Sequence, residues 1–234
     1  MAETLQSGGA TRSDFWELDG HRAILHTGRL VGMIDLTQPA RGLTAIRVDG
    51  AAIVGALMGV DVTSSETRGT SLDEPWTIAD AYIRGRDLVA TYREPCEQPF
   101  NLQLYWRTID AADGTPTLDL ICSVQTPLWE AHPRVTVCSS AFSRGAAILG
   151  EGLSCSNDSG VAYLESTRPG DFTSAAAPSD PQFSGALWNF GPQFMEKGVI
   201  RRLQVRGIFS SGDARSELAK LRAQLTAEEP ALTA

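Results

Sequence analysis

The chain of 234 residues is long enough to bury an ordinary hydrophobic core without disulfide or metal cross-links. Hydrophobic residues make up 42% of it and charged residues 21%, a composition typical of globular rather than disordered proteins. The formal net charge of −8 argues against a nucleic-acid-binding protein, which needs a basic face for phosphate contacts. Neutral ligands such as sugars are not excluded by this charge.

The N-terminus is polar and rich in glycine and serine, which predicts a disordered leader over residues 1–13 and a single domain over residues 14–234. The leader lacks the apolar segment of a secretory signal peptide. No other stretch approaches the roughly 20 apolar residues of a membrane span. These observations predict a cytoplasmic protein with no membrane partner.

The four cysteines form no CxxC pair and no Cys/His cluster with the spacing of zinc ligands; they are Cys96, Cys122, Cys138 and Cys155. Cys122 and Cys138 lie within alternating apolar runs, where a free thiol behaves as a small core residue. The sequence therefore predicts buried reduced thiols, no metal site and no other cofactor.

Short β-type runs alternate with turn signals from Phe15 to about residue 62. The dipeptides Asp19-Gly20 and Asp49-Gly50 predict type I′ hairpin turns, because both central residues of that turn need a positive φ. The antiparallel strands predicted here are Phe15–Leu18, Arg22–Thr27, Leu30–Leu36, Leu43–Val48 and Ala51–Val54.

After a polar loop from Ser64 to Glu74, the turn Gly85-Arg86 predicts a second hairpin. Further strands are indicated by alternation of apolar and polar residues, which places every second side chain on the same face. The predicted strands are 78–84, 87–92, 102–110, 118–125, 134–139, 163–166, 185–189 and 199–209. Their inward residues form the expected core, namely Leu104, Leu120, Cys122, Val124, Val135, Val137, Leu203 and Val205.

The region from about residue 150 to 185 is weakly patterned and rich in Ser, Gly, Pro and Ala. Only the C-terminal segment has helical periodicity, with Leu218, Leu221 and Leu225 on one stripe of a helix expected near residues 212–225. Many short strands, regular turns and one terminal helix predict an all-β fold, a large antiparallel β-sandwich with one C-terminal α-helix.

Two segments carry side chains suited to binding or catalysis. The loop Trp129–Arg134 brings an aromatic ring, an acid, an imidazole and a guanidinium together before a strand, and His132 is the natural proton carrier near neutral pH. Tyr105 and Arg107 share one strand face, where an aromatic ring can stack on a sugar and arginine can bind its hydroxyl or acidic groups. The simpler alternative for Trp129–Arg134 is a polar loop between two strands without a binding role. The simpler alternative for Tyr105 and Arg107 is an ordinary solvated sheet face.

A third candidate segment is Glu196–Arg202, where Gly198 marks a turn before a strand. Glu196 and Arg201 are then expected at a sheet end, beside further arginines. Such a group of charges can bind a polar ligand or form a structural ion-pair network.

The segment Leu30–Val54, "LVGMIDLTQPARGLTAIRVDGAAIV", resembles the opening of galactose mutarotase-like supersandwich domains. Later runs, with "YWR" at mid-chain and "EKGVIRR" near the end, are compatible with that fold. The resemblance concerns the strand pattern over about 170 residues and implies a supersandwich fold and a carbohydrate ligand. By analogy with the family's epimerases, His132 and Glu196 would act as acid and base.

The sequence thus favours a carbohydrate-recognising β-sandwich protein whose catalytic status and oligomeric state are left open. One alternative is a non-catalytic interaction or structural module. Another is an aldose-1-epimerase-like enzyme that uses His132 and Glu196 as its catalytic pair. Convergence of the expected binding residues on one face would favour carbohydrate recognition over the interaction module. The expected binding residues are Tyr105, Arg107, Trp129, Arg134 and Arg201.

Overall fold

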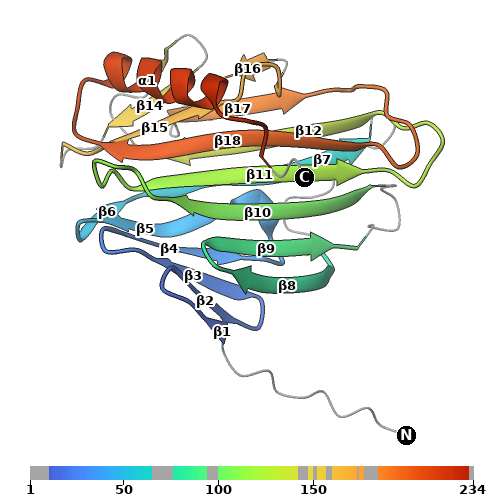
Figure 1. Ribbon diagram of the computed structural model, residues 1–234, viewed down its shortest axis with the longest axis horizontal. Coiled ribbons are helices and arrows are strands. Elements are labelled where there is room, and N and C mark those ends of the chain that lie inside the picture. The colour runs from blue at the N-terminus through green and yellow to red at the C-terminus, as the bar shows by residue number, and fades with distance from the viewer. Residues whose placement is uncertain are drawn as a thin grey trace, which may run out of the picture.

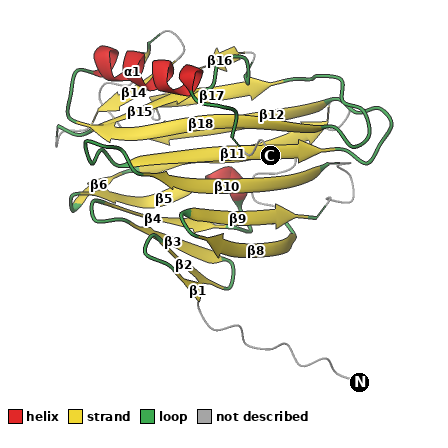
Figure 2. Cartoon of the chain, viewed as in Figure 1, coloured by secondary structure: helices red, strands yellow, loops and turns green. Residues whose placement is uncertain are grey.

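The computed structural model describes residues 11–64, 76–93, 100–141, 147–149, 152–156, 160–172, 174–176 and 184–231. Over these residues the chain forms two antiparallel β-sheets, one α-helix near the C-terminus and one short 3-10 helix, η1 (Pro39–Arg41). The sheets face each other as two layers (Figures 1 and 2). The predicted all-β sandwich with one C-terminal helix is confirmed.

The larger sheet has ten strands among the described residues, in the order β1-β2-β3-β4-β5-β7-β12-β17-β16, with β6 paired to β5 beside this path. Consecutive hairpins build its N-terminal half, and strands from the second half of the chain complete it. The strands are β1 (Thr11–Arg12), β2 (Trp16–Asp19), β3 (Arg22–His26), β4 (Leu30–Asp35), β5 (Leu43–Val48), β6 (Ala51–Ile53), β7 (Gly55–Ser64), β12 (Pro133–Ala141), β16 (Ser174–Ala176) and β17 (Ser184–Phe190).

The smaller sheet has eight strands in the described part of the chain, in the order β13-β14-β15-β18-β11-β10-β9-β8. Its strands are β8 (Ile78–Arg84), β9 (Asp87–Tyr92), β10 (Asn101–Ile109), β11 (Thr117–Gln125), β13 (Ala147–Ile148), β14 (Gly152–Ser156), β15 (Ala162–Thr167) and β18 (Ile200–Ser210). The long strands β10, β11 and β18 lie side by side at its centre (Figure 1).

Most predicted strands are present within one or two residues of their expected bounds. The Asp49-Gly50 turn has positive φ at both residues, 49° and 83°, as the type I′ prediction requires. At Asp19-Gly20 only the glycine has a positive φ, so the type I′ prediction is wrong there. The expected leader lies outside the described residues up to residue 10, and Thr11–Arg12 pair with β2.

The core lies between the two sheets and contains all eight predicted core residues, each no more than 2% exposed. Large side chains from both sheets fill it, among them Trp16, Trp106 and Trp188. Burial of this apolar surface is the main stabilising contribution to a sandwich of this kind. The strand faces inferred from alternation are therefore correct.

A buried carboxylate joins the two sheets inside this core. Glu165 on β15 accepts hydrogen bonds from Ser139 Oγ at 2.5 Å, Trp188 Nε1 at 2.5 Å and the hydroxyl of Tyr163. Ser139 lies at an irregularity in the β7–β12 pairing, where its Oγ accepts the N–H of Met58 at 2.8 Å. Burial raises the pKa of Glu165, and the three donors act in the opposite direction.

The C-terminal helix α1 (Ala214–Ala227) packs on the outer face of the smaller sheet, and it begins and ends two residues later than expected. Asp213 caps it by accepting the N–H of Ser216 at 2.9 Å. Its leucine stripe packs on outward residues of β15 and β18; this second cluster comprises Ala162, Leu164, Ile208, Leu218, Leu221 and Leu225. Among the described residues no helix is long and apolar enough to cross a membrane.

Candidate functional site

The helix leaves much of the smaller sheet's outer face uncovered, over β8, β9, β10, β11 and the start of β18 (Figure 1). We call this uncovered area the open face. Because side chains alternate along each strand, the strand register aligns the outward residues in rows that cross the sheet. Three such rows differ clearly in chemistry.

The first row is ionic and consists of Arg84, Asp87, Arg107, Asp119 and Arg206, which are in register across five strands. Arg107 donates to both carboxylate oxygens of Asp87, at 2.7 and 2.9 Å. Arg206 does the same to Asp119, at 2.6 and 2.8 Å, and also binds Glu228. These bidentate pairs tie neighbouring strands together and leave both guanidinium groups occupied.

The second row is largely uncharged and consists of Tyr82, Val89, Tyr105, Ile121 and Gln204. Tyr105 lies at its centre, and its hydroxyl donates to Gln103 Oε1. Burial raises the pKa of Tyr105, followed by the effect of Tyr82, so this phenol stays protonated at neutral pH. Val89 and Ile121 are fully buried beneath their neighbours. The row therefore offers the aromatic side chain of Tyr105, which Gln103 of the next row holds in place.

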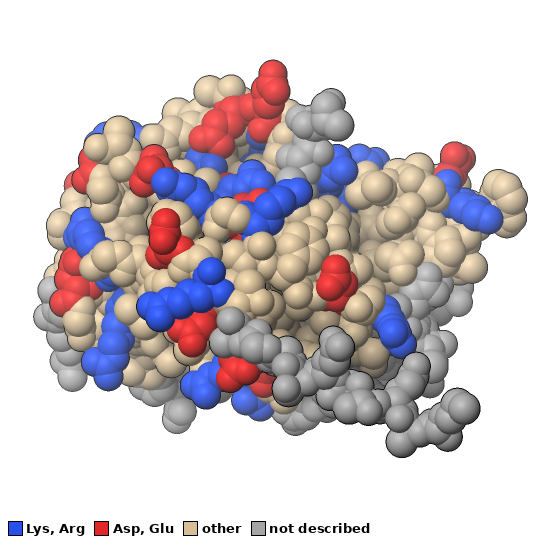
Figure 3. Space-filling view, turned by 60° about the horizontal axis from the view of Figure 1, so that its bottom comes forward, with Lys and Arg blue, Asp and Glu red and all other residues tan. Residues whose placement is uncertain are grey.

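The third row is polar and consists of Asp80, Thr91, Gln103, Ser123 and Arg202. Gln103 Nε2 donates to Thr91 Oγ1 at 2.8 Å, so the hydrogen-bonding groups on these two strands are linked. Positive and negative side chains intermingle over the side of the molecule shown in Figure 3 rather than forming a patch of one sign.

A pocket of about 320 Å³ lies between the second and third rows and the end of the sheet. Amide and hydroxyl groups dominate its lining, together with the ring of Tyr105 and one guanidinium. The lining residues are Thr91, Asn101, Leu102, Gln103, Tyr105, Ser123, Gln125, Ile200 and Arg202. None of these is a carboxylate. Such a pocket can exchange several neutral hydrogen bonds with a ligand and present one aromatic surface.

Beyond this pocket, two loops lie against each other at the end of the sandwich. Ala131 and Met195 exchange backbone hydrogen bonds of 3.0 and 2.8 Å, and Gly198 donates to the carbonyl of Thr126 at 3.2 Å. Large apolar side chains are exposed here; they are Leu128, Trp129, Phe194, Val199 and Ile200. Trp129 is 82% exposed, and Lys197 Nζ lies 5.2 Å from its ring centroid.

The residues that the sequence analysis proposed as ligand-binding or catalytic do not lie in one site in the structure. Tyr105 and Arg107 lie on the open face, although Arg107 is occupied by Asp87. Arg134 pairs with Thr63 and lies on the outer face of the other sheet. Arg201 is opposite Val124, so it faces away from Tyr105 although its neighbour Arg202 lines the pocket.

Trp129, His132 and Glu196 lie together on the two paired loops. His132 packs on Phe194, with ring centroids 5.8 Å apart, and Glu196 is exposed. Each of the two is one residue from the Ala131–Met195 pair, which limits their Cα separation to about 13 Å. They do not line the pocket described above.

Sequence reasoning missed most of the pocket, including Gln103, Ser123 and Arg202. Alternation along the strand 102–110 places Gln103 on the same face as Tyr105. Alternation along the strand 199–209 likewise places Arg202 on the same face as Gln204. The missing information was the register that sets Gln103 opposite Ser123 and Ser123 opposite Arg202. A single sequence does not contain this non-local pairing.

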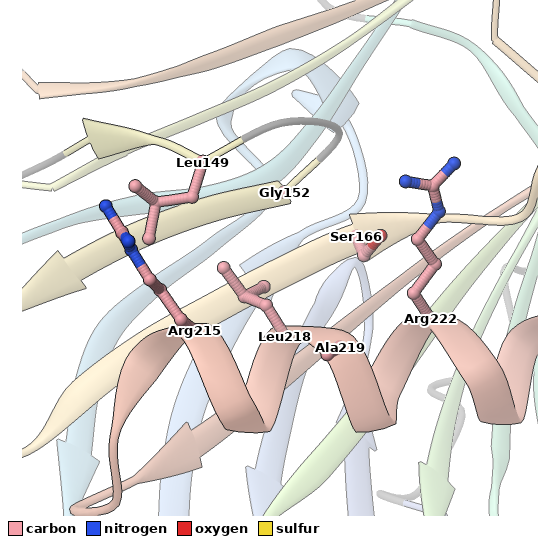
Figure 4. Close-up of a pocket in the computed structure, with 7 residues that line it drawn as sticks. All are labelled: Leu149, Gly152, Ser166, Arg215, Leu218, Ala219 and Arg222. Atoms are coloured by element: carbon pink, nitrogen blue, oxygen red, sulfur yellow. The ribbon is translucent and has the colours of Figure 1, made fainter.

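A second pocket of about 350 Å³ lies between α1 and strands β14 and β15 (Figure 4). Leu149 and Leu218 form apolar walls, and Arg215 and Arg222 extend from α1 on either side of Leu218. Its described lining residues include no aromatic side chain and a single hydroxyl, that of Ser166. This lining is less suited to a polyhydroxylated ligand than that of the open-face pocket.

In the described part of the chain the potential metal ligands lie apart, and three cysteines are free thiols. No group of three or more His, Cys, Asp or Glu side chains there is arranged to hold a metal ion. Burial raises the pKa of Cys138 to about 11 and that of Cys155 to about 12, and it also raises that of Cys122. These thiols stay protonated at neutral pH and are weak nucleophiles. Cys96 lies outside the described residues.

No protein-family model matches this sequence, and no curated protein matches it. Among solved structures, the chain is similar to a putative kojibiose phosphorylase from the human microbiome, with a TM-score of 0.52 and 7% sequence identity. The match covers 87% of this chain and 31% of that chain, so this protein spans about a third of the length of its neighbour. At this identity the likeness shows a shared fold and carries no statement about activity.

Proposed function

We propose that the protein binds a saccharide in the open-face pocket, on a sandwich of the galactose mutarotase-like supersandwich type. The observation that carries the proposal is the lining of this pocket, in which amides and hydroxyls surround the side chain of Tyr105. Sugar hydroxyls pair with such neutral donors and acceptors, and the C–H face of a sugar ring packs against an aromatic ring. The likeness to a carbohydrate-active enzyme supports the same ligand class.

The pocket is held in shape before any ligand arrives. Gln103 is fixed by Thr91 on one side and by the Tyr105 hydroxyl on the other. In the ionic row one step away, bidentate pairs join β9 to β10 and β11 to β18. Preorganisation of this kind lowers the entropic cost of binding a flexible oligosaccharide.

The test is a saccharide panel screened by isothermal titration calorimetry against the wild type, Tyr105→Ala and Gln103→Ala. Arg134→Ala is the matched control, because Arg134 is an exposed strand residue on the opposite sheet. We expect both pocket variants to lose at least about 10-fold in affinity, since each loses one aromatic or hydrogen-bonding contact. The control should bind as the wild type does. Wild-type protein that binds no saccharide would contradict the proposal.

The exposed apolar end favours a second candidate, a protein-interaction module. Trp129 and Phe194 are 82% and 53% exposed, on loops pinned to each other by backbone hydrogen bonds. Contiguous exposed apolar groups of this size often mark a protein interface. Sedimentation velocity over a range of concentrations would test self-association, with Trp129→Ser expected to shift the protein towards the monomer. A monomer at every concentration would exclude self-association as the role of this end.

A further inference from the structure

We infer that the saccharide of the open-face pocket is anionic and that Arg202 binds its acidic group; this inference rests on the proposed function. Arginine is a natural partner for such a group, because its planar fork of N–H donors matches a carboxylate or a sulfate.

The three other arginines that point outward from the strands of this face have acidic partners within the protein. Arg107 is bound by both oxygens of Asp87, and Arg206 by Asp119 and Glu228. Arg84 lies 3.5 Å from the same carboxylate, that of Asp87. Arg84 and Arg107 share the carboxylate of Asp87, and Arg206 has two carboxylates, so each of the three already has an acidic partner in the sheet or the helix end.

Arg202 differs from them. No ion pair or side-chain hydrogen bond joins it to any other residue in the described ranges, and its side chain is exposed at the pocket wall. Among the described residues the pocket lining contains no Asp or Glu, so this part of the lining carries a positive formal charge in a protein whose net charge is −8. A neutral sugar would leave this guanidinium without an ionic partner, whereas an acidic sugar supplies one.

Polar side chains beside Arg202 can bind the hydroxyl groups of such a ligand. Ser123 is its direct cross-strand neighbour, and Gln103 follows in the same row. Burial raises the pKa of the Tyr105 phenol, whereas the positive charges of Arg84 and, after it, Arg202 act in the opposite direction. An acidic group on Arg202 would therefore leave the attached sugar ring beside Tyr105 and the amide groups.

The experiment compares three chain-length-matched oligosaccharides by calorimetry: one neutral, one built from uronic acids and one sulfated. The variants are Arg202→Gln and, as matched control, Arg201→Gln. The two arginines are adjacent and both exposed, but they face opposite sides of β18. Thermal midpoints of both variants establish that they are folded.

We expect an acidic oligosaccharide to bind more tightly than the neutral one, with an affinity that falls as salt is raised. Arg202→Gln should weaken that binding by about 10- to 100-fold, the loss of a charge-assisted pair, and leave neutral binding nearly unchanged. Arg201→Gln should have no effect. Preference between the carboxylated and sulfated ligands identifies the acidic group that the site takes.

Two outcomes overturn the inference while the proposed function stands. One is equal affinity for neutral and acidic ligands, with no effect of Arg202→Gln. The other is an equal loss in both variants, which would mean that overall charge rather than the pocket matters. If no saccharide of any kind binds the wild type, the proposed function itself fails.

Discussion

Replacement of Ser139 by alanine removes one hydroxyl that connects the two sheets inside the core. Its Oγ accepts the N–H of Met58 at 2.8 Å and donates to Glu165 at 2.5 Å, and the side chain is fully buried. Met58 has a φ of 58°, in the left-handed region that non-glycine residues rarely occupy. The hydroxyl therefore supports an unusual backbone conformation and a buried carboxylate at the same time.

The expected loss follows from the two broken hydrogen bonds. A buried N–H without a partner costs about 1–3 kcal/mol, and a lost hydrogen bond to a charged group costs about 1.5–3 kcal/mol. Alanine leaves almost no cavity, so the packing contribution is small. Because the two effects share one network and do not simply add, we expect a loss of about 3–5 kcal/mol in the free energy of unfolding.

The assay is urea unfolding followed by the fluorescence of the five tryptophans. Ser140→Ala is the matched control, because Ser140 is the next residue of β12, is only partly buried and forms no side-chain hydrogen bond with the described residues. That variant should stay within about 0.5 kcal/mol of the wild type. A loss below about 1 kcal/mol for Ser139→Ala, or an equal loss in the control, would refute the role given to this hydroxyl.

Three further predictions concern pH, packing and the paired loops. Burial raises the pKa of Asp171 from 3.8 to about 6, so the folded state binds this proton more tightly than the unfolded state. The thermal midpoint of the wild type should therefore fall relative to that of Asp171→Asn as pH rises from about 4 to about 6, and parallel curves would contradict this. Leu120→Ala should cost about 2–5 kcal/mol in urea unfolding, because Leu120 is fully buried; an unchanged midpoint would mean that the core can close around the gap. If His132 and Glu196 act as acid and base, His132→Ala and Glu196→Gln should each abolish saccharide turnover and leave the thermal midpoint nearly unchanged, whereas a parallel loss of stability would indicate a structural role.

The strands were predictable because each depends on local signals. The hairpin 78–92 is found at its expected bounds, since a glycine turn and alternating flanks specify a hairpin without outside information. Strands β7 and β14 were not predicted as separate elements. β7 contains Gly55, Gly59 and Asp61, and β14 lies in a stretch rich in Ser and Gly, so neither has the alternation on which the prediction depends.

The site was predictable only in part, for a different reason. Alternation identified Tyr105 as an outward residue of its strand, and the pocket does contain it. Arg107 was chosen by the same logic, but cross-strand pairing places Asp87 opposite it and occupies its guanidinium. Alternation places the neighbours Arg201 and Arg202 on opposite faces of their strand, but only the pairing of β18 with β11 brings Arg202 beside Ser123 in the pocket.

The sequence by itself determined the fold class, the inward and outward faces of most strands, and the leucine stripe of the terminal helix. These features depend on periodicity and turn chemistry, which act over a few residues. The tertiary structure decided the strand order, the register and the area that α1 covers, and with them the identity of the pocket. Those features depend on contacts between residues far apart in the chain, such as Gln103 with Ser123 and Ser123 with Arg202, which local patterns do not encode.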